Sequence, residues 1–133
     1  MTESSRHKNS VKRLKELLQI LGTEIYENND ERGDRGFMMP KICTDRGDRQ
    51  YVLDIFAKLK DGTHIAVEVD YMKKASKRAA VKMRQRDDDL EGIGIKTLRY
   101  TPKALDGLTA AGIQADIDYF IYGRRAKMAY LQR

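Results

Sequence analysis

Two apolar segments interrupted by acidic residues constrain this chain more than any other feature. The first runs from Tyr51 to Leu59 and carries Asp54 near its centre. The second runs from His64 to Asp70 and ends in Glu68-Val69-Asp70. Short apolar runs of this kind predict strands, and the Asp61-Gly62 pair between them predicts a hairpin turn.

Such a hairpin brings the acidic residues together. Glu68 and Asp70 are two positions apart, so they point to the same face of a strand. Pairing about a turn at residues 61–62 puts Asp54 opposite residues 69–70, within one residue of Glu68 or Asp70. Neighbouring carboxylates repel one another, and a divalent cation with oxygen ligands removes the conflict. The pattern predicts a Mg²⁺ or Mn²⁺ site formed by Asp54, Glu68 and Asp70. The alternative is that these acids are solvent-exposed on half-buried strands.

The remaining pattern predicts a single α/β domain over residues 1–133, with a mixed central sheet flanked by helices. We expect residues 1–9 to be frayed and residues 110–133 to contain a C-terminal helix, from Ile113 to Leu131. Other helices are expected over residues 10–21 and 76–91, with a short one starting at Thr101-Pro102. The remaining strands are expected over residues 23–26, 37–43 and 95–100, and loops or turns over residues 28–36 and 44–49.

The composition favours an intracellular, cytoplasmic protein with no membrane contact. Hydrophobic residues make up 41% of the chain and charged residues 35%, as in a globular domain with a charged surface. The sequence has no apolar run of about 20 residues and no signal peptide core in residues 1–8. The single Cys43 fits a reducing compartment. The formal net charge of +6 favours a polyanionic partner such as nucleic acid.

Motifs in the second half of the chain add to the carboxylate pattern. Arg86-Asp87-Asp88-Asp89-Leu90 is followed by Gly94 and by a segment that contains Leu98-Arg99. Together with Asp54 and Glu68-Val69-Asp70, these motifs resemble the PD-(D/E)xK restriction-endonuclease-like superfamily, in particular the branch related to very-short-patch-repair endonucleases. The resemblance covers about residues 11–108. It implies a restriction-endonuclease-like three-layer sandwich and Mg²⁺-dependent endonuclease activity, with hydrolysis of phosphodiester bonds in DNA.

The resemblance also implies roles for further residues. In the family, an acid on the first helix completes the metal site; Glu16 matches that position, and Glu24 is the second candidate. Arg86 and Arg99 match basic positions near the site, where a guanidinium can hold a phosphate. Their alternative is a salt bridge to Asp87 or Asp89. This chain departs from the family where Asp70 replaces the usual lysine, for which the nearest substitutes are Lys73, Lys74 and Lys82.

A basic stretch follows the acidic residues and predicts a surface that binds phosphates. Its members are Lys73, Lys74, Lys77, Arg78, Lys82, Arg84 and Arg86. Two other functions stay open at this point: a non-catalytic nucleic-acid-binding module and an assembly subunit on the same fold. A homodimer is a further possibility, because one site per chain would need a partner to cut both strands of a duplex.

Overall fold

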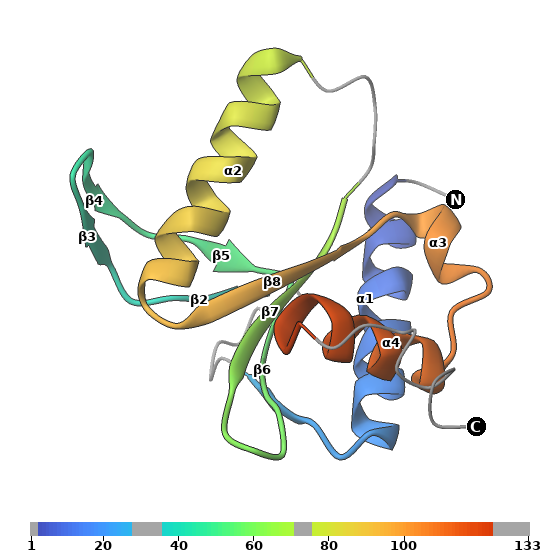
Figure 1. The fold of residues 1–133 in the computed structure, drawn as a ribbon. Helices are drawn as coiled ribbons and strands as arrows, with labels where there is room; N and C mark the ends of the chain where they lie inside the picture. Colours follow the sequence, from blue (N-terminus) through green and yellow to red (C-terminus); the bar gives the residue numbers. More distant parts are fainter. Residues whose placement is uncertain (1–2, 28–35, 71–75, 124–133) are drawn as a thin grey trace.

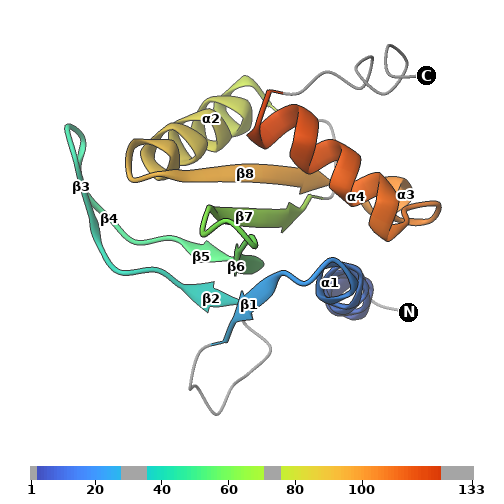
Figure 2. The ribbon, with the colours of Figure 1, turned by 60° about the horizontal axis from the view of Figure 1, so that its bottom comes forward.

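The chain folds around a four-stranded mixed sheet in a computed structural model that describes residues 3–27, 36–70 and 76–123 (Figures 1 and 2). The strand order is β1-β6-β7-β8. β1 (Glu24–Tyr26), β6 (Ile55–Lys58) and β7 (His64–Val69) are antiparallel neighbours, whereas β8 (Ile95–Tyr100) runs parallel to β7. The prediction of a mixed sheet with flanking helices is therefore confirmed.

The two faces of β7 contact different layers. Ile65, Val67 and Val69 face a larger core. Its helices are α1 (Glu3–Ile20), α3 (Pro102–Leu105), α4 (Ala110–Asp116) and the π-helix η1 (Ile117–Ile121). Ala66 faces a smaller core with Leu90 of α2 (Lys77–Gly92). Because side chains alternate along a strand, Glu68 lies on the α2 face as well.

The predicted hairpin joins β6 to β7. Leu59 donates its backbone N–H to the carbonyl of Thr63 at 2.8 Å, and Gly62 has a φ of +93°, which favours glycine. Ile55 pairs with Val67 in the register of the two strands. Continuing that register by one residue brings Asp54 opposite Glu68, within one or two residues of the predicted position.

The expected strand over residues 51–59 is divided by a bend at Asp54. Before the bend, β5 (Val52–Leu53) leaves the main sheet and pairs with β2 (Phe37–Met38). β3 (Ile42–Thr44) and β4 (Gly47–Arg49) extend this pair as a hairpin. We call residues 36–53 the ribbon; it projects from the sheet on the same side as α2 (Figure 1).

Two expectations about this part of the chain need correction. The strand predicted over residues 37–43 is divided at Met39–Lys41, where Pro40 cannot donate to a ladder. The turn predicted over residues 44–49 is shorter, because β4 occupies its second half.

The helix boundaries agree in part with expectation. Ser76 caps α2 by accepting from Ala79 N–H at 3.2 Å, and Thr101 caps α3 by accepting from Ala104 N–H at 3.1 Å. The expectation that residues 1–9 are frayed is wrong from Glu3 onward, because α1 begins there. No helix among the described residues is long and apolar enough to span a membrane.

The C-terminal helix is shorter than predicted within the described chain. α4 and η1 carry it to Ile121, and Gly123, with a φ of +68°, follows the end of η1. The rest of the predicted helix, in residues 124–131, lies outside the described residues, as do residues 28–35 of the loop predicted over residues 28–36.

Candidate functional site

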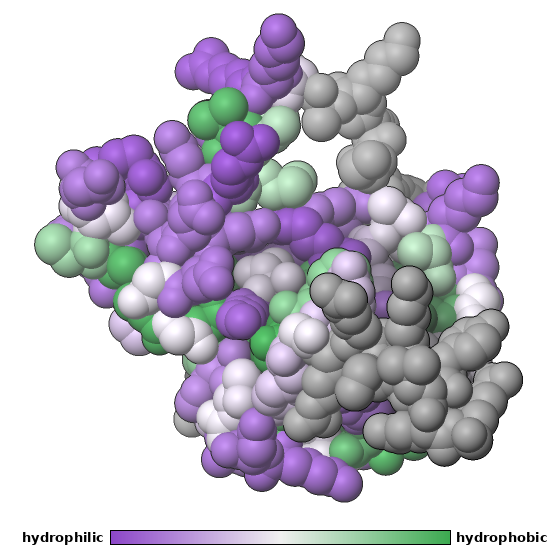
Figure 3. All heavy atoms as spheres, in the orientation of Figure 1, coloured by the Kyte–Doolittle hydropathy of each residue, from purple (hydrophilic) through white to green (hydrophobic). Residues whose placement is uncertain are grey.

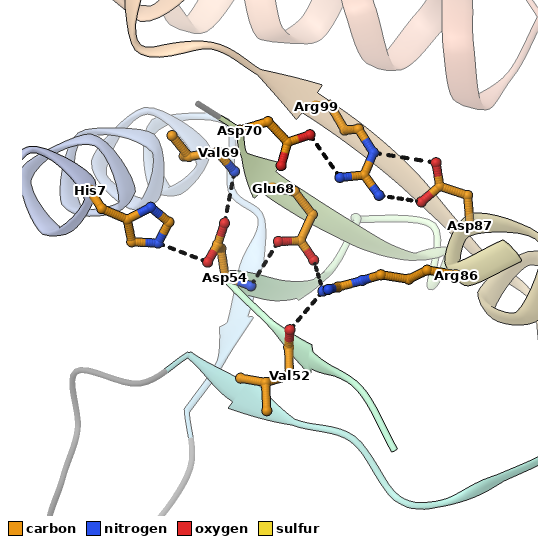
Figure 4. Close-up of polar contacts among 9 residues, drawn as sticks. All are labelled: His7, Val52, Asp54, Glu68, Val69, Asp70, Arg86, Asp87 and Arg99. Atoms are coloured by element: carbon orange, nitrogen blue, oxygen red, sulfur yellow. Dashed lines mark hydrogen bonds and ion pairs between the residues drawn. The ribbon is translucent and has the colours of Figure 1, made fainter. Parts of the chain in front are cut away.

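Asp54 and Glu68 lie against each other at the end of β7 (Figure 4). The backbone N–H of Asp54 donates to Glu68 Oε2 at 3.3 Å. Asp54 Oδ2 accepts from the backbone N–H of Val69 at 2.8 Å. The bend between β5 and β6 therefore fixes the Asp54 carboxylate beside that of Glu68, as the sequence predicted for this pair.

Glu68 is nearly buried, with a side chain that is 6% exposed. Its burial, followed by the negative charge of Asp54, raises its pKa to about 8, while Arg86 acts in the opposite direction. The pair thus resists holding two negative charges at once. A positive charge at this point would favour the ionised form of both acids.

Arg86 reaches Glu68 from α2. Its Nη2 donates to Glu68 Oε1 and, at 2.6 Å, to the carbonyl oxygen of Val52. The guanidinium lies 5.5 Å from the centre of the Tyr51 ring. Its Nε is buried without a hydrogen-bond partner. Arg86 therefore pairs with Glu68, not with Asp87 or Asp89 as the alternative had it.

Asp70 belongs to a second network on the same face. Arg99 of β8 donates from Nη1 to Asp70 Oδ2 at 2.8 Å and from Nη2 to Asp87 Oδ1 at 2.5 Å. The sequence offered a salt bridge to Asp87 or Asp89 as the alternative for Arg99. The structure shows the bridge to Asp87, in addition to the one to Asp70. Asp70 points to Arg99 (Figure 4), so its role as a ligand beside Asp54 stays a prediction.

The first helix contributes His7 to the site. His7 Nε2 lies 2.9 Å from Asp54 Oδ1. Glu16, the acid predicted there, is exposed and lies nine residues further along α1, about 13 Å of helix. The second candidate, Glu24, pairs with Lys58 at 3.2 Å instead. Neither acid is brought to the Asp54–Glu68 pair.

His7 was missed because residues 1–9 were expected to be frayed. A signal was present, since His7, Val11, Leu14 and Leu18 follow one another at the spacing of a single helix face. That stripe predicts a helix which starts earlier and carries His7 on its buried side.

Two further groups of charged residues lie along α2. Lys77 and Arg78, predicted to bind nucleic acid, are exposed in the first turn of α2, while Lys73 and Lys74 lie outside the described residues. Asp89 of α2, with a side chain that is 8% exposed, accepts from Arg46 Nη2 at 2.7 Å. Tyr51 also donates its hydroxyl to Asp89, at 2.7 Å.

The carboxylate oxygens of Asp54 and Glu68 are suitable ligands for a hard divalent cation. Carboxylate oxygens suit Mg²⁺ and Mn²⁺, and a bound cation would favour the ionised form of Glu68, whose pKa is raised by burial and by Asp54. In the part of the chain that the structure describes, no three His, Cys, Asp or Glu side chains form a ready-made metal group. A cation would therefore rely on Asp54 and Glu68 together with backbone or solvent oxygens.

Comparison with known proteins adds no assignment. A scan against protein-family models finds no match for this chain. A search of curated proteins finds no similar sequence. What the chain does is therefore inferred from its own side chains.

Proposed function

We propose that this chain is a metal-dependent endonuclease that hydrolyses phosphodiester bonds in DNA. The observation that carries the proposal is the contact between Asp54 and the buried Glu68, with Arg86 beside them and Arg99 on the same face of the sheet. The proposal includes a restriction-endonuclease-like fold, because the sequence motifs are similar to the very-short-patch-repair-related branch of that superfamily.

Each side chain of the site has a separate role in the proposed reaction. Asp54, held by Val69 N–H and His7, offers a carboxylate of fixed direction, and Glu68 offers a second one. Asp54 and Glu68 would hold a Mg²⁺ or Mn²⁺ ion, which would supply Lewis acidity for the activation of water and for the charge on a phosphate. Arg86 and Arg99 provide guanidinium groups that can hold phosphate oxygens. Asp70 and Asp87 keep Arg99 oriented.

Cleavage of supercoiled plasmid and branched DNA tests the proposal. Wild-type protein is expected to cut in Mg²⁺ or Mn²⁺ and to stop in excess chelator. Asp54→Asn protein, purified in parallel, controls for contaminating nucleases. Activity that persists in chelator, or that is equal in the variant, overturns the proposal.

A non-catalytic DNA-binding module is the second candidate, and one observation favours it. Glu68 and Asp70 are each already bonded to a guanidinium, so these two acids have a counter-charge without a metal. DNA binding without cleavage of any DNA form, together with no cation binding, would support this candidate over the enzyme.

We predict that His7→Ala weakens cation binding by about 10- to 100-fold, because groups that orient a ligand have effects of this size. His7→Gln keeps a donor nitrogen near Asp54 and is expected to recover most of the affinity. Calorimetric titration with Mn²⁺ measures both variants. Equal affinities in wild type and His7→Ala would show that His7 does not hold Asp54 for a cation.

We predict that Lys77 and Arg78 contact phosphates in bound DNA. Each contact removed by substitution with Ala is expected to reduce the slope of log affinity against log salt by about 0.9 on duplex DNA. Salt titrations followed by fluorescence anisotropy measure the slope. Lys12→Ala with Lys103→Ala is the matched control, since both lysines are exposed on other elements. An unchanged slope in the Lys77 and Arg78 variant excludes this surface.

A further inference from the structure

The outer end of the ribbon is exposed on both strands. In the β3–β4 hairpin, Cys43 pairs with Asp48, and Gly47, Asp48 and Arg49 are all exposed. Lys41 and Gln50, which flank the hairpin, are exposed too. Burial of Met39, Ile42 and Leu53 secures the inner part of the ribbon against the smaller core. The far end is therefore polar and accessible from outside.

This exposed end is nevertheless held in place. Asp89 accepts hydrogen bonds from Arg46 at the turn of the hairpin and from Tyr51 at its base, both at 2.7 Å. Charge-assisted bonds to a carboxylate with little solvent contact are among the stronger ones in proteins. The turn of the hairpin and the strand that leaves its base are thus both fixed to one residue in the C-terminal half of α2.

The charges on α2 run against the helix dipole. Its N-terminal half carries Lys77, Arg78, Lys82 and Arg84, and no acidic residue occurs between Ser76 and Arg86. Asp87, Asp88, Asp89 and Glu91 lie toward the C-terminus. A helix is stabilised by the opposite order, with acidic residues in its first turn and basic residues in its last turn. Bound anions at the N-terminal half would offset this cost.

The basic half of α2 lies on the same side of the site as the outer end of the ribbon, where Lys41 and Arg49 are exposed beside Asp45 and Asp48. Arg78, Lys82 and Asp89 follow one another at spacings of four and seven residues, which places them along one face of α2. Asp89 holds the hairpin, so that face continues toward the ribbon. Hydrophilic side chains gather over the free end of α2 and the outer end of the ribbon (Figure 3).

The candidate site lies at the base of both surfaces. Val52 of the ribbon accepts from Arg86 of α2, and Asp54 follows β5 directly. From Asp48 to Asp54 the chain can span at most about 20 Å, which is about six base pairs along a duplex. A nucleic acid on these surfaces would therefore reach Asp54 and Glu68.

We propose that the ribbon and the basic half of α2 bind double-stranded DNA, with the β3–β4 hairpin in the major groove. The major groove admits a two-stranded ribbon, and Arg49 and Lys41 offer donors to base edges and phosphates. Single strands are bound by stacking on aromatic rings. In the described residues of α2 and the ribbon, the only aromatics, Phe37 and Tyr51, are partly buried. This inference rests on the proposed function and names a duplex as its substrate.

Binding to a duplex in chelator, where cleavage is absent, tests the ribbon separately from the enzyme. Lys41→Ala with Arg49→Ala is expected to weaken duplex binding about tenfold or more. In the same variant, the part of the salt dependence that comes from Lys77 and Arg78 of α2 is expected to remain. Lys12→Ala with Lys103→Ala removes the same number of positive charges elsewhere and is expected to have a smaller effect.

Protection from dimethyl sulfate shows which groove the protein occupies, because this reagent methylates guanine N7 in the major groove and adenine N3 in the minor groove. Wild-type protein should protect guanine N7, and Lys41→Ala with Arg49→Ala should lose that protection. Unchanged duplex affinity in this variant, protection of adenine N3 alone, or tighter binding to single strands than to duplex would overturn the inference. A chain that binds DNA in this way but never cuts it would overturn the proposed function and leave the ribbon assignment standing.

Discussion

Asp54→Asn is expected to lower DNA cleavage by at least about 10³-fold while the domain stays folded. The loss follows because a neutral amide is a poor ligand for a divalent cation, whose electrostatic contribution is several kcal/mol of barrier lowering. The fold should survive, because the remaining amide oxygen still accepts from Val69 N–H. Plasmid cleavage rates and thermal unfolding of the same preparations measure the two effects.

The same substitution should relieve the repulsion at Glu68. The negative charge of Asp54 is one cause of the raised pKa of Glu68, so Asn at position 54 should bring that pKa down toward its ordinary value. Stability near pH 8 is then expected to be unchanged or slightly higher than that of wild type. An inactive variant that is also unfolded would not identify Asp54 as a ligand, and Glu68→Gln would take its place in the cleavage assay. Full activity in folded Asp54→Asn contradicts the site.

Arg86→Ala is expected to lower the free energy of unfolding by about 3 kcal/mol at pH 9, since it leaves a buried carboxylate without its partner. The loss should be smaller at pH 6, because Glu68 can then take up a proton. Urea unfolding at the two pH values measures the difference. Arg84→Ala, an exposed arginine on the same helix, is the matched control and should change stability by less than about 0.5 kcal/mol.

The direction of this pH dependence follows from Glu68. Its pKa is about 8 in the folded chain against 4.5 in the reference state, so the folded chain retains a proton that the unfolded chain has released. The retained proton stabilises the folded chain. This stabilisation is fully present below about pH 4.5 and is lost as the pH rises to about 8. Without Arg86 the pKa of Glu68 rises further, and the loss continues to higher pH. The double variant Arg86→Ala with Glu68→Gln should lack this dependence; if it keeps the full dependence, another group is responsible.

The central hairpin could be predicted from the sequence because local signals agreed there. The Asp61-Gly62 turn and the two apolar runs set the register, and that register brought Asp54 to Glu68. The division of the first run at Asp54 could not be predicted, because it depends on the pairing of β5 with β2, which lies at the other end of the ribbon. A strand pattern alone does not tell which partner a segment has.

The partners of the acids were harder to predict than their positions. Arg86 and Arg99 were found from the sequence as basic residues near the site, but which carboxylate each one holds depends on the packing of α2 against β8. His7 depends on where α1 begins and on how its first turns lie against the bend at Asp54. The helical spacing of His7, Val11 and Leu14 indicates that His7 lies on the buried face of a helix, but no local pattern indicates that Asp54 is its partner.

Titration with Mn²⁺ by calorimetry, at pH 7 and in buffers of different ionisation enthalpy, tests the proposed cation site most directly. Because the pKa of Glu68 is about 8, a cation that binds its carboxylate must displace a proton. We expect saturable binding to wild type with the release of up to about one proton per ion, and no such binding to Asp54→Asn. Absence of saturable binding to folded wild type, or equal binding to folded Asp54→Asn, would contradict it.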